Sequence, residues 1–405
     1  MTLADEYFNY TKKYQASHGE KTLVLMQVGS FFECYAMLEP DGSYSGSHIQ
    51  EFAIINDMSI AKKNICVGKN EIVMAGFGLG QLEKYVKKML TNGYTVVVYS
   101  QDIQSKNTTR SLACIYSPGT FFNNNETIDN ENNYNQNLSN NTICIWLHVS
   151  NANQVIKEST ITIGISLIDI LTGKLINYEY SNHYINSPTV YDQLEKYVAI
   201  YNPTEVIIIT NNKEENFIDT VINYANIQCQ KFHKIYITDS KTKSEFQAIA
   251  ENCEKQKYQS ALIDKIYGIG SFHEKHEFRE YSIANQSLCF LLDFIEKHNP
   301  SLVKSIDYPI FENHCEKLVL ANHSLKQLNI ISDNRYNGKL SCVANFLNNC
   351  ITNIGKRRFN YDLLHPISNC RELEKSYDVV ENLITTNFYK IIREELNNVR
   401  DIEKI

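Results

Sequence analysis

Hydrophobic and polar positions along the chain follow three successive patterns, which predict three regions of different architecture. The first begins with apolar residues at helical spacing between Leu3 and Tyr14, and the apolar run 23–28 after them predicts a strand. The same reasoning predicts a strand, a helix and another strand further on, at 72–75, 81–91 and 94–99. Residues 1–120 are therefore expected to form a small mixed α/β domain.

The second and third regions are separated from the first by a polar stretch. Residues 121–141 hold too little apolar surface to fold, so a flexible linker is expected there. Alternating apolar residues then predict three strands, a helix and a further strand, at 143–149, 160–168, 174–180, 191–201 and 205–209. This order predicts an RNase H-like α/β domain over 142–270. From residue 277 the period is helical, so 271–405 are expected to be all-α.

Composition narrows the class of protein. A hydrophobic content of 43% and a charged content of 21% are typical of a folded chain, and the net charge of −7 argues against a protein that is basic overall. No apolar run is long enough to cross a bilayer, and the first residues lack the apolar core of a signal peptide. The 11 cysteines form no C-x-x-C pair. Free thiols in a reducing intracellular compartment are expected, whether cytoplasm, nucleoid, organelle or viral replication site.

The stretch from Gly29 to Glu33 is the strongest candidate for a functional site. Gly29 and Ser30 would let the backbone approach a ligand closely, and on a strand Phe31 and Glu33 would share the face opposite Phe32. A carboxylate buried beside a ring would be unpaired, so the two are expected to form an exposed pair that meets a nucleobase. A phenylalanine can wedge between base steps and kink a duplex. The alternative is that both rings lie in the core and Glu33 is a surface charge.

Two other sites would carry different chemistry. Asp169 would be a metal ligand if the second region were an RNase H-like nuclease, but such chemistry needs several converging carboxylates, and the neighbouring strands offer none. His273 and His276 are spaced to share a helix face and bind zinc, but no cysteine pair nearby completes a tetrahedral site. These alternatives predict magnesium-dependent cleavage of plain duplex and one bound zinc ion, respectively.

Several motifs resemble those of the MutS family of DNA mismatch-repair proteins, and they occur in the same order. Residues 29–33 resemble its Gly-x-Phe-Tyr-Glu, and "MSIAKKN" at 58–64 resembles Ile-Ser-Leu-Thr-Lys-Arg-Gly. Residues 73–101 resemble its Pro-Met-Ala-Gly loop, helix and Gly-Tyr-x-Val-x-x-x-x-Gln strand, and "SPGT" resembles Thr-Pro-Gly-Thr. Residues 338–384 are similar to the core-domain signature with Thr-x-x-Gly-x-Arg. The resemblance covers nearly the whole chain and is weakest over 121–141 and 211–275.

The resemblance implies a fold and a set of DNA-binding residues. The regions would be a mismatch-recognition domain, a low-complexity linker, a connector domain and an incomplete helical core or lever domain. Phe31 would be the intercalating wedge and Glu33 its partner at the mispaired base, while Phe32 replaces the usual Tyr and keeps its packing role. The DNA-binding residues would then be Phe31, Glu33, Lys62, Lys63, Ser30 and Phe32. Two sites depart from the family pattern. The segment Gly78-Leu79-Gly80 leaves other DNA contacts of its loop undefined, and Asp362 leaves the packing of a joint in the core domain undefined.

The same resemblance implies partners and missing parts. The chain has no Gly-x-x-x-x-Gly-Lys-Ser/Thr motif, so it is not expected to be an enzyme as given. A full-length relative would be a DNA-dependent ATPase, with ATP and Mg²⁺ bound in a domain beyond Ile405. The partner would be duplex DNA with mismatches or small loops, and the full-length protein would be a homodimer. The composition suggests a viral or organellar branch. The alternative is a MutS-like scaffold or branched-DNA binder, whose relatives lack the Phe-x-Glu pair.

Overall fold

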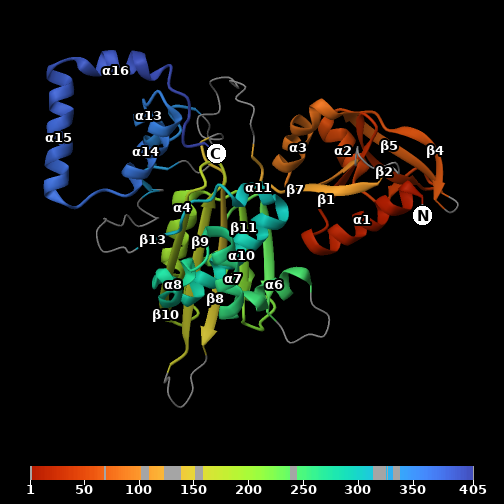
Figure 1. Ribbon diagram of the computed structural model, residues 1–405, viewed down its shortest axis with the longest axis horizontal. Helices are drawn as coiled ribbons and strands as arrows, with labels where there is room; N and C mark the ends of the chain where they lie inside the picture. Colours follow the sequence, from red (N-terminus) through yellow and green to blue (C-terminus); the bar gives the residue numbers. More distant parts are fainter. Residues whose placement is uncertain are drawn as a thin grey trace.

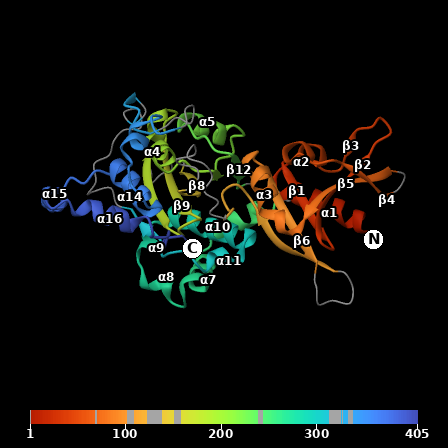
Figure 2. The same ribbon diagram turned by 90° about the horizontal axis from the view of Figure 1, so that it is seen from above.

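Two β-sheets and a group of helices follow one another along the chain. The computed structural model describes residues 2–67, 70–101, 109–122, 138–150, 158–237, 244–312, 325, 327–331 and 338–404. The second sheet lies between the first sheet and the last helices (Figures 1 and 2). The expected fold class, a mixed α/β region, an RNase H-like region and a helical segment, is confirmed. Most of the expected linker lies outside the described residues.

The first sheet has the strand order β4-β5-β2-β1-β6-β7, with β3 paired to β2. Its strands are β1 (Thr22–Val28), β2 (Phe31–Leu38), β3 (Tyr44–Ser45), β4 (Ala61–Val67), β5 (Asn70–Gly78), β6 (Thr95–Gln101) and β7 (Arg110–Tyr116). The helices are α1 (Leu3–His18), α2 (Ile49–Asn56), the short 3₁₀ turn η1 (Leu79–Gln81) and α3 (Leu82–Thr91). All of these elements except η1 contribute residues to one core. The tip between β1 and β2 carries the candidate stretch.

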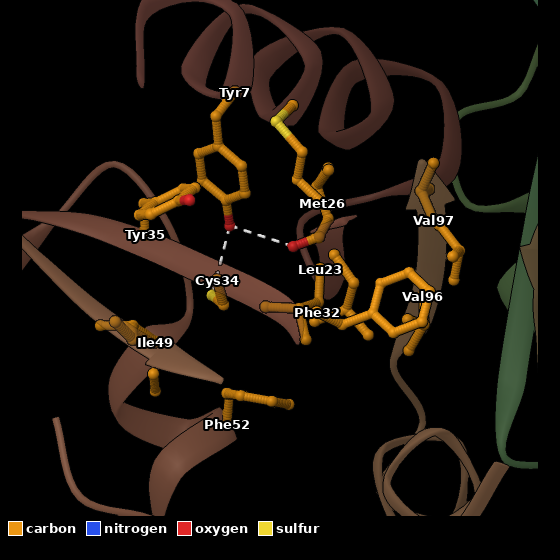
Figure 3. Packing of buried hydrophobic residues seen from close by; sticks show 14 of the residues in the cluster. Tyr7, Leu23, Met26, Phe32, Cys34, Tyr35, Ile49, Phe52, Val96 and Val97 are labelled. Atoms are coloured by element: carbon orange, nitrogen blue, oxygen red, sulfur yellow. Dashed lines mark hydrogen bonds between the residues drawn. The ribbon is translucent and has the colours of Figure 1, made fainter. Parts of the chain in front are cut away.

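Helices cover both faces of the first sheet (Figure 3). On one face, Tyr7 of α1 packs edge-on against Tyr35, with ring centroids 5.1 Å apart, and its hydroxyl donates to the Val24 carbonyl at 3.1 Å. On the other face, Phe52 of α2 and Phe32 both pack against Phe77. Because β2 is covered on both faces, its sequence lacks a clear alternation, and the sequence analysis did not assign it as a strand.

The second sheet has the order β12-β11-β8-β9-β10-β13. Strands β8, β9 and β10 are antiparallel neighbours, while β11 runs parallel to β8 and β12 parallel to β11. The strands are β8 (Asn141–Ser150), β9 (Thr160–Asp169), β10 (Leu175–His183), β11 (Glu205–Thr210), β12 (Lys231–Tyr236) and β13 (Ile310–Phe311). The elements that pack on one face are η2 (Pro188–Tyr191), α4 (Asp192–Tyr201) and α5 (Phe217–Tyr224).

The helices on the other face extend beyond the expected boundary at residue 270. They are α6 (Glu245–Cys253), α7 (Gln256–Tyr267), α8 (Ser271–Glu274), α9 (Glu277–Glu280), α10 (Ser282–His298) and α11 (Pro300–Val303). Helix α10 lies directly on the sheet, because a Cβ on Gly164 would come within 2.5 Å of the Ile283 carbonyl carbon and the Ser287 hydroxyl donates to the Cys144 carbonyl at 2.7 Å. A helical period therefore does not separate a helix that covers a sheet from an all-α region.

A buried carboxylate joins the two sheets. Glu205 begins β11 and accepts hydrogen bonds from the Ser117 hydroxyl, from the Gly119 N–H at 2.9 Å and from His233 at 2.6 Å. Burial raises the pKa of the Glu205 carboxyl, but the hydrogen bond and charge of His233, together with the charges of Lys231 and His298, lower it to about 2. The Ser-Pro-Gly-Thr motif is thus a connecting segment whose polar groups form hydrogen bonds with residues of the second sheet.

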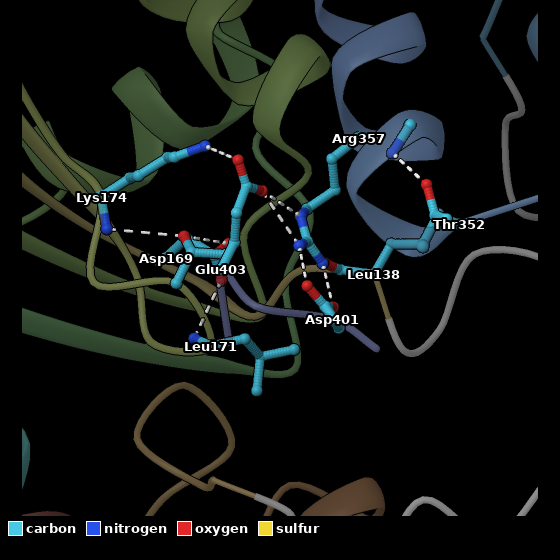
Figure 4. Close-up of polar contacts among 10 residues, drawn as sticks. Leu138, Asp169, Leu171, Lys174, Thr352, Arg357, Asp401 and Glu403 are labelled. Carbon is cyan, nitrogen blue, oxygen red and sulfur yellow. Dashed lines mark hydrogen bonds and ion pairs between the residues drawn. The ribbon is translucent and has the colours of Figure 1, made fainter. Parts of the chain in front are cut away.

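Helices α13 (Val343–Leu347), α14 (Asn353–Leu364), α15 (Cys370–Thr385) and α16 (Phe388–Leu396) form the last part. Arg357 of α14 makes two parallel bonds to Asp401 and further bonds to Glu403, and it also donates to the Leu138 carbonyl (Figure 4). Lys174 beside the second sheet pairs with Glu403 at 3.0 Å. This network ties the helical part to the second sheet.

Two further expectations are tested directly. The cysteines that the structure describes are all free, as the sequence predicts. Within the described ranges, the helices are all too short or too polar to span a bilayer.

Candidate nucleic-acid interface

The candidate stretch forms the turn and first residues of a β-hairpin. Val28 pairs with Phe31, so Gly29 and Ser30 alone make the connection between β1 and β2. Gly29 has a φ of 59°, and glycine with positive φ at the first central position is typical of type II′ hairpin turns. The tip therefore needs glycine, and the turn projects the next side chain at the end of the sheet.

The two adjacent rings have opposite surroundings. Phe31 is 53% exposed, whereas Phe32 is buried and its ring centroid lies 6.0 Å from that of Phe77. Phe31 faces Gly78 across the β2–β5 pair, and a Cβ on Gly78 would have no heavy atom within 4 Å. The alternative with both rings in the core is thus wrong for Phe31. An exposed ring at the tip of a braced hairpin is available to a flat ligand.

Glu33 is not exposed, and the expectation of an exposed Phe31–Glu33 pair is wrong for the carboxylate. Its residue exposure is 7%, and its Oε2 accepts hydrogen bonds from the Tyr35 hydroxyl and from Lys63 Nζ. Lys63 Nζ also donates to the Tyr35 hydroxyl at 3.0 Å and lies 4.7 Å from the centroid of its ring. A buried carboxylate is tolerated where a positive charge and a hydroxyl satisfy it, which the sequence reasoning did not consider.

The three-residue cluster Glu33–Tyr35–Lys63 requires a residue without a side chain, Gly76, on the strand between Glu33 and Lys63. Lys63 lies on β4 and reaches Glu33 on β2 across the intervening strand β5, where Gly76 stands opposite Glu33. A Cβ on Gly76 would lie 3.2 Å from Cγ of Glu33 and 2.7 Å from the Phe32 carbonyl oxygen. Burial raises the pKa of Tyr35 and the hydrogen bond to Glu33 raises it further, so the hydroxyl stays protonated and donates.

The two lysines assigned together by the sequence have different environments. The Lys62 side chain is 68% exposed and pairs with Glu71 at 2.7 Å on the surface, whereas the Lys63 side chain is 20% exposed and turned toward Glu33. Lys62 is therefore the lysine that faces solvent. Ser30 lies at the tip, and its carbonyl accepts a hydrogen bond from the Leu79 N–H at 3.1 Å.

The divergent loop also contributes to the tip. Leu79 is 40% exposed and its backbone contacts the turn that carries Phe31. Gly80, like Gly78, has no heavy atom within 4 Å of a built Cβ, so the backbone here is open to an approaching molecule. The loop therefore adds a second exposed apolar side chain at the same end of the sheet.

The sequence pattern alone does not point to Tyr35, Gly76, Gln27 or Gln101, although all contact this site. Tyr35 follows Glu33 on the same face of β2, and the strand period would have paired them if β2 had been recognised. Gly76 and Gln101 lie in motifs that the sequence analysis quoted, but their contacts join strands that are distant in sequence.

The rival sites show other roles: Asp169 satisfies a turn, and His276 lies near the carboxylates of Glu277 and Glu280. The Asp169 carboxylate accepts hydrogen bonds from the N–H groups of Asn140 and Leu171 and from the Thr172 hydroxyl. These bonds hold the turn after β9. The described residues contain no group of three or more His, Cys, Asp or Glu side chains arranged to hold a metal ion, and this covers Asp169, His273 and His276. Nothing in this geometry converges on a nuclease or zinc site.

Comparison with known proteins identifies family models for both ends of the chain and related sequences over nearly its whole length. Residues 7–125 match the family model of MutS domain I, and residues 323–405 match that of MutS domain III. A mutS homologue of Acanthamoeba polyphaga mimivirus is 29% identical over 100% of this chain and 37% of its own length. The DNA mismatch repair protein MutS of Caldanaerobacter subterraneus is 24% identical over 100% of this chain and 40% of its own length. A mitochondrial mutS homologue of Sarcophyton glaucum is 22% identical over 99% of this chain and 42% of its own length. The chain thus spans about two fifths of these relatives.

Proposed function

Because the chain belongs to the MutS family, we propose that it recognises mispaired duplex DNA and that Phe31 is the side chain that enters the duplex. The single observation that carries this proposal is the 53% exposure of Phe31 next to a two-residue turn, while the ring of the adjacent Phe32 is buried in the core. A wedge must be both exposed and supported from behind, and Phe31 has both properties. Unstacking a base costs a few kcal/mol in a sound duplex and less at a mismatch, so such a wedge responds to weak pairing.

The environment of Glu33 supports a role for its carboxylate next to DNA. A free carboxylate would be repelled by phosphates, but the Lys63 ammonium balances its charge. A base edge that bonds Glu33 would share the carboxylate with Lys63 and Tyr35, because each carboxylate oxygen can accept more than one hydrogen bond. We propose that the paired Glu33 accepts one further hydrogen bond from the mispaired base. Lys62, exposed on the same strand as Lys63, would contact the phosphate backbone.

Properties of a whole MutS protein are proposals for this chain. They are ATP and Mg²⁺ binding with DNA-dependent ATPase activity outside residues 1–405, a homodimer, a repair function and a reducing intracellular compartment. The relatives that carry the repair names are more than twice as long as this chain, which covers 37–42% of each of the three.

Fluorescence of 2-aminopurine placed beside a G·T mismatch tests the wedge directly. The 405-residue chain should raise the fluorescence of the mismatched duplex, because insertion of Phe31 unstacks the probe, and the matched duplex should change little. Phe31→Ala should abolish the rise and lower the mismatch-to-matched affinity ratio by roughly ten- to hundredfold, since stacking on an aromatic ring contributes about 1–3 kcal/mol per base. Phe31→Tyr keeps the ring and should keep the signal.

The control is Ile185→Ala, which removes another exposed apolar side chain, from the loop between β10 and η2. It should leave both duplexes unaffected. If Phe31→Ala binds mismatched and matched DNA with the wild-type ratio, the wedge is wrong. Preferential binding to four-way junctions in that case would support the scaffold or branched-DNA reading instead.

A further inference from the structure

A ring of hydrogen bonds braces the turn that carries Phe31. The Gly29 N–H donates to Oε1 of Gln101 at 3.1 Å, and the Gln27 side-chain amide donates to the Gly29 carbonyl at 3.1 Å. The ring closes because the Gln101 backbone N–H donates to Oε1 of Gln27 at 2.9 Å. Both polar groups of one turn residue are thus held by side chains from two strands, β1 and β6.

This arrangement is unusual for the tip of a two-residue hairpin. The backbone groups of such a turn normally point to water, which holds them in no fixed position. The strand pairs at the base of this turn are Val28 with Phe31 and Phe31 with Gly78. The glutamines add bonds on the β6 side, and the Leu79 N–H holds the Ser30 carbonyl on the β5 side at 3.1 Å. The turn is therefore fixed from both sides of the sheet.

A fixed turn matters because a wedge must transmit force. Unstacking two base pairs costs a few kcal/mol. A tip that is free to bend would move away from the bases and would not separate them. Groups that are already held in the bound position lose less conformational entropy on binding. The brace acts on Gly29, which lies two residues before Phe31, so it sets where the ring stands without touching DNA itself.

We propose that Gln101 is a positioning residue for Phe31, which it acts on through Gly29, and that Gln27 completes its bond ring. The inference rests on the proposed wedge function, because a brace has no recognition role if Phe31 does not enter DNA. It assigns to the glutamine at the end of β6 a role in mismatch discrimination at a distance from the bases. The brace affects the discrimination between mismatched and matched duplex, and it does not affect binding to the DNA phosphate backbone.

The test uses two substitutions of the same residue in the full 405-residue chain. Gln101→Met has a similar length and removes the acceptor, while Gln101→Glu keeps an oxygen at the acceptor position. Amide hydrogen exchange at Gly29 reports on the brace without any DNA. We expect exchange to be about fivefold faster in Gln101→Met, the equivalent of one ordinary hydrogen bond, and unchanged in Gln101→Glu.

Binding then reports on function. Gln101→Met should lower the mismatch-to-matched affinity ratio by about fivefold, the same one-bond equivalent, and change affinity for matched duplex less than twofold. Gln101→Glu should keep the wild-type ratio, although its added charge weakens binding to both duplexes. Gln27→Glu removes the donor to the Gly29 carbonyl and should lower the ratio like Gln101→Met. This second variant keeps the test valid if Gln101→Met does not fold.

The possible failures are distinguishable. If Phe31→Ala lowers the ratio and Gln101→Met and Gln27→Glu do not, Gln101 has no positioning role and the wedge proposal stands. If Phe31→Ala leaves the ratio unchanged, both proposals are wrong. If Gly29 exchange is the same in wild type and Gln101→Met, the brace does not exist in solution and the inference is overturned whatever the binding data.

Discussion

Lys63 and Glu33 form an ion pair across three strands, with the Glu33 side chain only 9% exposed and the Lys63 side chain 20% exposed. The pair resolves an electrostatic difficulty of the proposed site, since a lone carboxylate at a DNA surface would be repelled by phosphates. Here it is neutralised within the fold and held by a third group, the Tyr35 hydroxyl. The same lysine is therefore unavailable as a free phosphate contact, a role left to Lys62.

Removing Lys63 should destabilise the first domain. Lys63→Met leaves the Glu33 carboxylate buried with Tyr35 alone, and the free energy of unfolding should fall by about 1–3 kcal/mol, less than for a fully buried pair because Lys63 is partly exposed. Adding Glu33→Gln should recover part of this loss, because the unpaired charge is then gone. Urea denaturation of the two single variants and the double variant measures the coupling.

Lys62→Met is the matched control for that experiment, since Lys62 is the preceding residue and forms an exposed pair. It should leave the unfolding midpoint unchanged and weaken binding to matched and mismatched duplex equally, with a smaller dependence on salt. Strictly additive effects of Lys63→Met and Glu33→Gln would show that the pair contributes nothing in solution.

Gly76→Ala should disturb the site through space. The added Cβ would lie 2.7 Å from the Phe32 carbonyl oxygen and 3.2 Å from Cγ of Glu33, so β2 must shift. We expect a loss of about 1–3 kcal/mol in the free energy of unfolding, as for other overpacked positions. Gly78→Ala, two residues further on the same strand, meets no atom within 4 Å and serves as the control. Equal unfolding midpoints for the two variants would contradict the close packing at Gly76.

The contact between the two sheets should weaken in mild acid. His18 of α1 and His298 of α10 lie with ring centroids 5.3 Å apart, and burial lowers the pKa of His18 to about 2 and that of His298 to about 4. His233 and Lys231 also lower the pKa of His18, while Glu205 raises it. Unfolded histidines bind protons below about pH 6.5, so the unfolded state takes up more protons as the pH falls from there toward 4.

The free energy of unfolding should therefore be largest above pH 6.5 and decrease below it, by up to about 1.4 kcal/mol per pH unit for each histidine. Urea unfolding at pH 7 and pH 5 measures the change. His18→Phe keeps an aromatic ring beside Phe246 and His298, and it should reduce the pH dependence. His183→Gln, on an exposed histidine, should not. The same slope in wild type and His18→Phe would mean that His18 is not buried neutral.

Arg357→Lys should loosen the joint between the helical part and the second sheet. The guanidinium makes two bonds to Asp401, two to Glu403 and one to the Leu138 carbonyl, and an ammonium reproduces only part of this fork. Removing bonds to charged partners should cost about 1.5–3 kcal/mol, which urea denaturation measures as an earlier unfolding transition.

Arg358→Lys provides the comparison, since its pair with Asp362 is exposed on the same helix. It should behave as wild type. If both variants unfold alike, the Arg357 network does not hold the joint.

The sequence by itself determined the order of the regions and the identity of the key ring. Alternation and helical spacing located most strands of the second sheet and the opening helix, because burial of one face imposes a period that is local in sequence. Glycine before Phe31 indicated a tight turn, and Phe-x-Glu supplied the resemblance. Strand β2 was missed because both its faces are covered, and helix α10 was expected to belong to the all-α region although it covers a sheet.

Only the tertiary structure decided what surrounds those residues. That Phe31 is exposed while Phe32 is buried follows from where the sheet ends. The ion pair of Glu33 with Lys63 follows from strands β2, β5 and β4 lying side by side. The bond ring of Gln27, Gly29 and Gln101 likewise joins residues up to 74 positions apart. Periodicity in the sequence shows which face of an element is buried. Charges and hydrogen bonds are satisfied by residues that are neighbours in space, and the strand order of the folded sheet determines which residues these are.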